Sequence, residues 1–255
     1  MKIGSFKERL TRGELVVGTW LKTPSYIVAE VLAGSDLDVL CLDAEHAPFD
    51  RGDLDAAVLA CRARDMPVLI RTPSAAPETI LNALDIGAAG VVVPHVVDER
   101  SAQSIAHSCH YGPGGRGYAG SSRAAAYTRT KMPQHLAASR AGTVVVAQIE
   151  DAEGVDNIEA IAREPRIDCL FIGRADLAVS YGAASASDPT VIAAAERVCA
   201  AGARAGRAVG MFVPDLAEIP RWRTLGVSLY LLESDHTFLL RGAAALGAAV
   251  RAAIP

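Results

Sequence analysis

The sequence has few aromatic residues, no cluster of basic residues and no long apolar run. Aromatic residues make up 5% of the 255 residues, and the net charge is −4 with a pI near 5.9. Nucleic acid is therefore not an expected partner. No apolar run reaches membrane-spanning length, and the start MKIGSFKERL lacks the apolar core of a signal peptide. We therefore expect a soluble, cytoplasmic protein with no membrane partner.

Paired cysteines are also lacking. The five cysteines include no CxxC pair, and two of them, Cys41 and Cys169, lie inside apolar strand patterns. We interpret the cysteines as small buried hydrophobic side chains. An odd number of unpaired cysteines is typical of a reducing compartment.

Two apolar runs end in carboxylates. Residues 143–147 precede Glu150, and residues 169–172 precede Asp176. Such runs predict strands buried on both faces, and carboxylates at the C-terminal ends of neighbouring parallel strands converge above the sheet. A hard divalent cation prefers such oxygen ligands. The alternative is that the two acids cap the following helices or pair with a base.

Eight strand-then-helix units follow a short N-terminal helix at residues 5–14. Alternating βα units indicate a parallel sheet, and eight of them at this length predict a (β/α)₈ TIM barrel as a single domain over residues 1–255. An open doubly wound sheet would usually carry a glycine-rich phosphate turn after the first strand, which residues 20–24 are not. We expect strands at residues 16–21, 39–43, 67–71, 90–95, 144–150, 170–173, 208–213 and 228–232, and helices at 26–33, 51–64, 77–86, 99–109, 154–163, 190–205, 216–225 and 237–254.

One long segment, residues 111–140, interrupts this alternation. It is rich in Gly, Ser and Arg, and a long excursion of this kind is usually functional or mobile.

Polar residues recur at the predicted strand ends, where a barrel of this kind carries its active site. His46 is the natural general base because its unperturbed pKa lies near neutrality, although it could instead pack a turn. Arg71 offers a planar donor fork for a carboxylate or an enolate oxygen, or it could form a salt bridge to a neighbouring strand-end acid. His95 is expected to have a supporting or structural role. Asp43 is expected to bond backbone or a cation.

The residues at several of these positions form motifs that resemble a known family, the HpcH/HpaI class II pyruvate aldolases. The resemblance runs over nearly the whole chain. The motifs are GTWL at residues 18–21, LDAEHAP at 42–48, QIE at 148–150 and FIGRADL at 171–177.

The resemblance implies a metal-dependent lyase that reversibly cleaves a 4-hydroxy-2-oxo acid to pyruvate and an aldehyde through a metal-stabilised enolate. Carried over, it makes Glu150 and Asp176 the ligands of Mg²⁺, Mn²⁺ or Co²⁺. It assigns substrate contacts to Gln148 and to the backbone of the stretch that follows the sixth strand, including Gly173, Ala175 and Asp176. No lysine for a Schiff base is required, and the strand ends considered above offer none.

For proton transfer, the resemblance implies that Arg71 stabilises the enolate oxygen, that His46 is the base and that Asp85 raises the basicity of His46. Asp85 alone, late in the third helix of the barrel, would be interpreted as a surface acid. The resemblance also implies a homohexamer, a trimer of dimers. The apolar helix at residues 237–254 would be exchanged between subunits, and residues 111–140 would lie near a subunit contact and the active site.

The sequence departs from the family pattern at position 174, where Arg replaces the usual Pro. This cation could favour an acidic acceptor aldehyde or could pair with an acid. The competing interpretations of the whole chain are an acyl-CoA lyase similar to citrate lyase β or malyl-CoA lyase, and a non-catalytic barrel that binds small acids.

Overall fold

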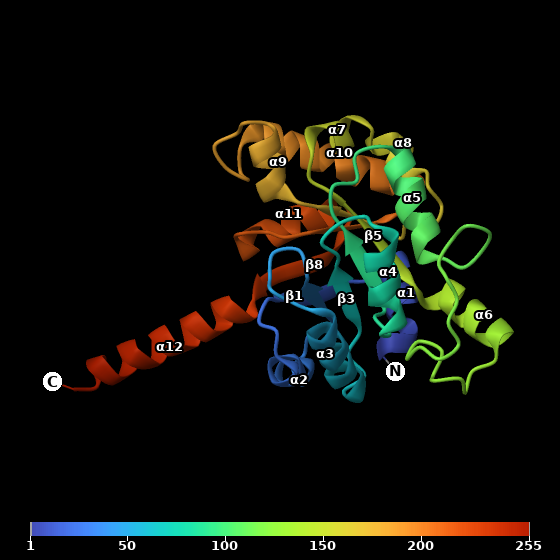
Figure 1. Ribbon diagram of the computed structural model, residues 1–255. Helices are drawn as coiled ribbons and strands as arrows, with labels where there is room; N and C mark the ends of the chain where they lie inside the picture. Colours follow the sequence, from blue (N-terminus) through green and yellow to red (C-terminus); the bar gives the residue numbers. More distant parts are fainter. Residues whose placement is uncertain (1, 255) are drawn as a thin grey trace.

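The computed structural model describes residues 2–254, and its centre is a closed barrel of eight parallel strands in the order of the sequence (Figure 1). Each strand pairs with the next, and β8 closes the barrel against β1. The predicted (β/α)₈ barrel is therefore confirmed. The strands are β1 (Val16–Leu21), β2 (Val39–Asp43), β3 (Val68–Arg71), β4 (Gly90–Val93), β5 (Val144–Ile149), β6 (Cys169–Ile172), β7 (Ala208–Met211) and β8 (Val227–Ser234).

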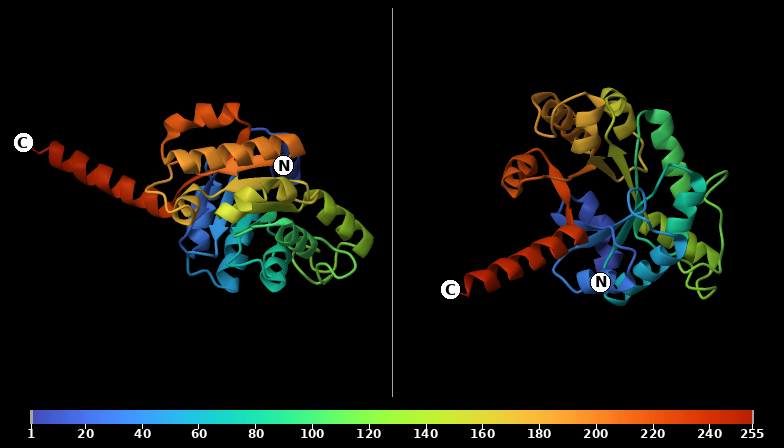
Figure 2. Two further views of the ribbon diagram at one scale, coloured as in Figure 1. Left: turned by 90° about the horizontal axis from the view of Figure 1, so that it is seen from above. Right: turned by 60° about the vertical axis from the view of Figure 1, so that its left-hand side comes forward.

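Helices surround the barrel and return the chain from the C-terminal end of one strand to the N-terminal end of the next (Figures 1 and 2). Their starts follow local capping rules: Asp50 and Asp98 each form a capping box, and Pro189 occupies the first turn of its helix. The helices are α1 (Lys2–Thr11), α2 (Tyr26–Ala33), α3 (Arg51–Ala63), α4 (Pro77–Asp85), α5 (Glu99–Cys109), α6 (Met132–Gly142), α7 (Ala152–Asp156), α8 (Ile158–Ala162), α9 (Arg174–Ser180), α10 (Pro189–Ala205), the 3₁₀ turn η1 (Leu216–Glu218), α11 (Ile219–Thr224) and α12 (Asp235–Ala252).

Two apolar clusters hold the barrel together. The larger lies between the strands and the surrounding helices, and the smaller fills the barrel interior. Phe6 and Leu10 of α1 belong to the interior cluster, so α1 closes the N-terminal end of the barrel. At the other end the rings of Trp20 and Phe171 meet edge to face, with centroids 5.8 Å apart. The interior is therefore a packed core, and a site can form only above it.

All five cysteines are buried and free, as expected from the sequence. Within residues 2–254, no helix is long and apolar enough to cross a membrane.

The predicted strands agree with the observed ones to within two residues at each end, but several helices differ. α6 lies inside the segment interpreted as an irregular excursion, because Pro133 in its first turn and the following Ala and Leu residues favour a helix. α9 was not expected, and the helix predicted at 154–163 is divided into α7 and α8 at Asn157. Positions 1 and 255 of the predicted domain lie outside the described residues.

The last helix, α12, leaves the barrel instead of packing on it. Both figures show it projecting from the body of the molecule (Figures 1 and 2). Leu239, Leu240, Leu246 and Val250 are 52–72% exposed on it. Such an apolar face on a surface helix marks an interaction site.

Candidate active site

A cavity of about 440 Å³ opens at the C-terminal ends of the strands. It lies above the Trp20–Phe171 contact, and both rings line it. Most of the residues predicted from the sequence as site residues are also in its wall. The lining residues are Trp20, Lys22, His46, Arg71, Gln148, Phe171, Ile172, Gly173, Arg174, Ala175, Asp176, Phe212, Glu233, Ser234 and Thr237.

Arg71, the last residue of β3, is held in one orientation. Its Nε and Nη2 donate to the two carboxylate oxygens of Asp43 at 2.9 and 2.8 Å, and its guanidinium lies 4.5 Å from the centroid of a Trp20 ring. The salt-bridge alternative is thus realised with the strand-end acid Asp43, and Arg71 also lines the cavity. Burial alone would raise the pKa of Asp43, but the hydrogen bonds and charge of Arg71 lower it overall. The pair is therefore charged at neutral pH. The remaining terminal nitrogen of Arg71, Nη1, lies 3.3 Å from Glu45, and the side chain lines the cavity.

Glu150 follows β5 and is almost fully buried. One of its oxygens accepts from the backbone N–H of His95 at 2.9 Å, and the other accepts from the Gln148 side chain. Burial raises the pKa of Glu150, and the nearby charge of Asp176 adds to this. A Cβ on Gly173 would lie 3.0 Å from Oε2 of Glu150, so a side chain there would crowd the carboxylate. The carboxylate is thus fixed in place. The Nδ1 atom of His95 lies 3.6 Å from Oε1, and the charge of His95 offsets only part of the rise in the pKa of Glu150.

Glu45 and His95 approach Glu150 from β2 and β4. One ligand atom from each of the three residues lies within 4.8 Å of the others, which is the spacing of a possible cation site. His95 adopts a left-handed backbone conformation with φ 55°, and its Nδ1 lies 3.0 Å from Asp151. The hydrogen bond with Asp151 raises the pKa of His95, although burial opposes this. The sequence signal for Glu45 was its place beside His46 in the LDAEHAP motif.

Asp176 lies in the first turn of α9 and lines the same cavity. It is close enough for its charge to raise the pKa of Glu150. The structure therefore brings the two predicted metal ligands near one another, with Asp176 in the cavity wall and Glu150 buried beside it, and it adds Glu45 and His95 beside Glu150.

Arg174 lines this cavity, but its guanidinium is already paired with other residues. Its Nη1 lies 2.7 Å from Glu218, and its Nε and Nη2 donate to the carbonyl oxygen of Ala186. Trp222 packs beside the guanidinium, whose carbon lies 5.3 Å from the ring centroid. Of the two alternatives for this position, the structure shows pairing with an acid.

His46 and Asp85 are placed at opposite ends of the barrel. His46 follows β2, lines the cavity and lies 3.7 Å from Glu45 through Nε2. Asp85 ends α4, which returns the chain to the N-terminal end of β4, and there it pairs with Arg116. The predicted dyad is therefore not formed within one chain.

Lys22 is the residue that sequence reasoning missed. It directly follows β1, lines the cavity and places Nζ 3.2 Å from Asp43. The statement that no strand end offers a lysine is thus wrong. The position of Lys22 immediately after the first predicted strand was the sequence signal for it.

Comparison with known proteins agrees with this geometry. Residues 17–238 match the family described as HpcH/HpaI aldolase/citrate lyase. The chain is 34% identical over 243 residues to the "Hydroxypyruvate/pyruvate aldolase" of Paraburkholderia phytofirmans, covering 92% of this chain and 93% of the relative. It is 35% identical over 254 residues to the "4-hydroxy-2-oxovalerate aldolase" of Rhodococcus jostii, covering 96% and 95%. A solved structure of a family protein from Burkholderia cenocepacia J2315 superposes with a TM-score of 0.90 at 37% identity, covering 97% of this chain and 99% of that one.

Proposed function

Because the chain belongs to the HpcH/HpaI aldolase/citrate lyase family, we propose that it is an aldolase, a carbon–carbon lyase that reversibly cleaves a 4-hydroxy-2-oxo acid to pyruvate and an aldehyde. The observation that carries this proposal is a cavity lined by Arg71, Gln148 and Asp176, with Glu150 hydrogen-bonded to Gln148 directly behind the wall. Cleavage leaves the electrons of the broken carbon–carbon bond on pyruvate as an enolate. A site for this reaction must therefore stabilise a developing negative charge.

The donor set around Glu150 fits a divalent cation. Glu150 and Asp176 supply carboxylate oxygens, and burial raises the pKa of Glu150 even though His95 lies 3.6 Å from it. We assign these two residues as the ligands, with Glu45 and His95 as neighbours able to complete the site. Oxygen ligands suit Mg²⁺ and Mn²⁺, and an added imidazole suits Co²⁺. Such a cation, when bound, would supply positive charge beside the oxygens of the oxo acid.

The side chains and backbone of the cavity would each contact a different part of the substrate. Arg71, held by Asp43 and Trp20 and lining the cavity, would stabilise the enolate oxygen with its positive charge. The amide of Gln148 and the backbone of Gly173 and Ala175 would contact the substrate, since the Oε1 atom of Gln148 is buried without a hydrogen-bond partner among the described residues.

His46 would exchange the proton with the substrate hydroxyl, because it is the exposed imidazole in the cavity wall. Asp85 lies at the opposite end of its own barrel, so it can act on His46 only from a second copy of the chain.

The proposal is tested by exchange of the pyruvate methyl protons for deuterium, followed by proton NMR. Exchange should require Mg²⁺, Mn²⁺ or Co²⁺, stop with EDTA, and fall at least about 100-fold in Glu150→Gln and Asp176→Asn. Titration with Mn²⁺ should show weaker metal binding in both variants. Glu196→Gln, which alters only an exposed ion pair with Arg221, is the matched control. Exchange that survives EDTA, or trapping of pyruvate on Lys22 by borohydride, would contradict the metal-dependent mechanism.

We also propose that the chain forms a hexamer, a trimer of dimers, in which α12 packs on a second subunit. The exposed leucines of α12 support this, as does the need for Asp85 to come from another copy. Light scattering should give six times the chain mass, and Leu240→Glu should lower it, while Leu216→Glu on η1 should not. A monomer at micromolar concentration would rule this assembly out. The unpaired thiols fit a cytoplasmic location.

A further inference from the structure

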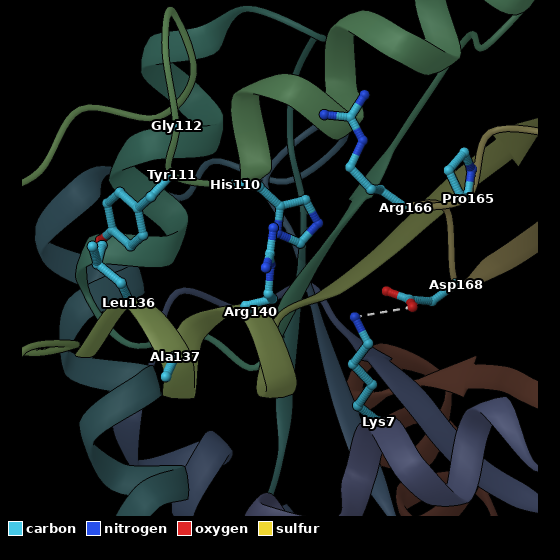
Figure 3. A pocket seen from close by; sticks show the side chains of 10 residues that line it. All are labelled: Lys7, His110, Tyr111, Gly112, Leu136, Ala137, Arg140, Pro165, Arg166 and Asp168. Atoms are coloured by element: carbon cyan, nitrogen blue, oxygen red, sulfur yellow. Dashed lines mark ion pairs between the residues drawn. The ribbon is translucent and has the colours of Figure 1, made fainter. Parts of the chain in front are cut away.

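A second cavity lies at the opposite end of the barrel from the candidate active site, and its residues have no part in the proposed reaction. Its volume is about 550 Å³, which is within the range of small-molecule sites. We call it the basal cavity (Figure 3). It is lined by Lys7, His110, Tyr111, Gly112, Leu136, Ala137, Arg140, Pro165, Arg166 and Asp168.

We propose that the basal cavity binds a small organic molecule with an oxyanion head group, a phosphate or a carboxylate, attached to an apolar body. The cationic part of the wall would hold the head group, and the apolar part would hold the body.

The cationic part carries more positive charge than its acids neutralise. Lys7 lies 3.0 Å from Asp168, and Arg166 lies 2.7 Å from Glu164. The guanidinium of Arg140 makes no hydrogen bond or ion pair with any residue of 2–254. A guanidinium donates a planar fork of N–H groups that matches carboxylate and phosphate oxygens. Arg140 is therefore the free cation that a ligand could pair with.

His110 supplies a second, independent sign of a ligand. Its Nε2 is buried and has no hydrogen-bond partner among the described residues. Buried polar atoms are almost always paired, so an orphaned one requires an explanation. Figure 3 shows the His110 ring and the Arg140 side chain directed toward one another at the edge of the cavity. An oxyanion placed between them would accept from both side chains.

The titration of His110 agrees with this placement. Burial, followed by the charges of Lys7, Arg166, Arg140 and Arg116, lowers its pKa to about 4. The imidazole is thus neutral near pH 7 and able to carry a proton on Nε2. A bound anion would offset the surrounding positive charge, so the pKa of His110 should rise on binding.

The other part of the wall is apolar. The Tyr111 hydroxyl already bonds His135 at 2.9 Å, and Arg116 covers its ring at 4.7 Å from the centroid. The tyrosine therefore contributes a fixed aromatic surface, and Leu136 and Pro165 add apolar side chains elsewhere in the lining. This surface selects a ligand with a ring or hydrocarbon body over an inorganic ion.

The test is calorimetric titration of the intact oligomer with phenyl phosphate, inorganic phosphate, benzoate and benzyl alcohol. Phenyl phosphate or benzoate should bind saturably, and the tighter of the two identifies the head group. Arg140→Ala should weaken that binding at least about tenfold, or 1.4 kcal/mol. NMR should show the pKa of His110 rising in the complex.

Two variants serve as controls. Arg197 lies on α10 and forms an exposed ion pair with Asp156 of α7. Arg197→Ala therefore removes the same charge far from the basal cavity and should leave the affinity unchanged. Arg71→Lys alters the candidate active site and should also leave it unchanged. Equal weakening in Arg140→Ala and Arg197→Ala, or loss of binding in Arg71→Lys, would overturn the proposal. It would also be overturned if no probe saturated, or if inorganic phosphate or benzyl alcohol bound as tightly as the bifunctional probes.

Discussion

Replacement of Asp43 by Asn should reveal how strongly the floor of the active site depends on one ion pair. The substitution keeps the shape of the side chain but removes the charge that faces Arg71 through bonds of 2.9 and 2.8 Å. Asp43 is fully buried and Arg71 nearly so, and the guanidinium would keep only Glu45, 3.3 Å from Nη1, as a counter-charge. Breaking a buried pair by removal of one partner costs about 3–5 kcal/mol. For a chain of this size that corresponds to a fall in Tm of about 6–20 °C.

The assay is chemical and thermal unfolding at neutral pH, compared with Asp38→Asn. Asp38 also binds an arginine, Arg9, at 3.0 Å, but that pair is partly exposed, so the control should lose no more than about 1 kcal/mol. Because the folded-state pKa of Asp43 is lowered, its contribution to stability is present above the unfolded pKa near about 4. This contribution is lost as the pH falls through the folded pKa, and Asp43→Asn should remove that acid dependence.

A double-mutant cycle makes the reasoning refutable. Asp43→Leu with Arg71→Met removes both charges, so the pair should be markedly less destabilised than the sum of the two single variants. Additive losses would show that the two side chains are not coupled. A single Asp43→Asn variant as stable as the unmodified protein would show that the buried guanidinium does not need this partner.

Two further predictions concern the barrel interior and the basal cavity. Gly210→Ala should lower stability by about 1–3 kcal/mol in denaturant unfolding, because a Cβ there would lie 2.8 Å from Phe171 and 3.1 Å from Leu229. Gly142→Ala, whose Cβ would meet nothing within 4 Å, should be neutral or stabilising, and equal losses in both would refute the packing argument. Since the pKa of His110 is lowered to about 4, the unfolded chain binds a proton below about pH 6.5 that the native protein does not bind. The free energy of unfolding should therefore decrease as the pH falls from 6.5 toward 4. The decrease should be smaller in His110→Gln. An NMR titration that gives His110 a pKa near 6.5 would contradict this.

The barrel could be predicted from the sequence because its determinants are local. Runs such as residues 144–149 are apolar throughout and end in polar residues, so strand position and strand end can be located together. The placement of Arg71 and Asp176 in one cavity, with Glu150 behind its lining residue Gln148, follows directly from those ends.

Other features depend on contacts that no local pattern encodes. The pairing of Arg174 with Glu218 joins residues 44 positions apart, and the cation-site geometry of Glu45 with His95 requires the left-handed backbone of His95. The failure of Asp85 to reach His46 becomes visible only once α4 is seen to run back along the barrel. The roles carried over from the family for these residues stay predictions.

The burial of all five cysteines has a practical consequence for labelling. Burial raises the pKa of Cys61, Cys109 and Cys199 to about 12 and raises those of the other two still further, so almost no thiolate exists near neutral pH. Since the thiolate is the nucleophile, maleimide probes should leave the native thiols unmodified. A cysteine introduced at Leu246 on α12 would then be the one reactive thiol of the folded chain, with no need to remove the others. A fluorophore there would test, by energy transfer between differently labelled copies, the proposal that α12 packs on a second subunit.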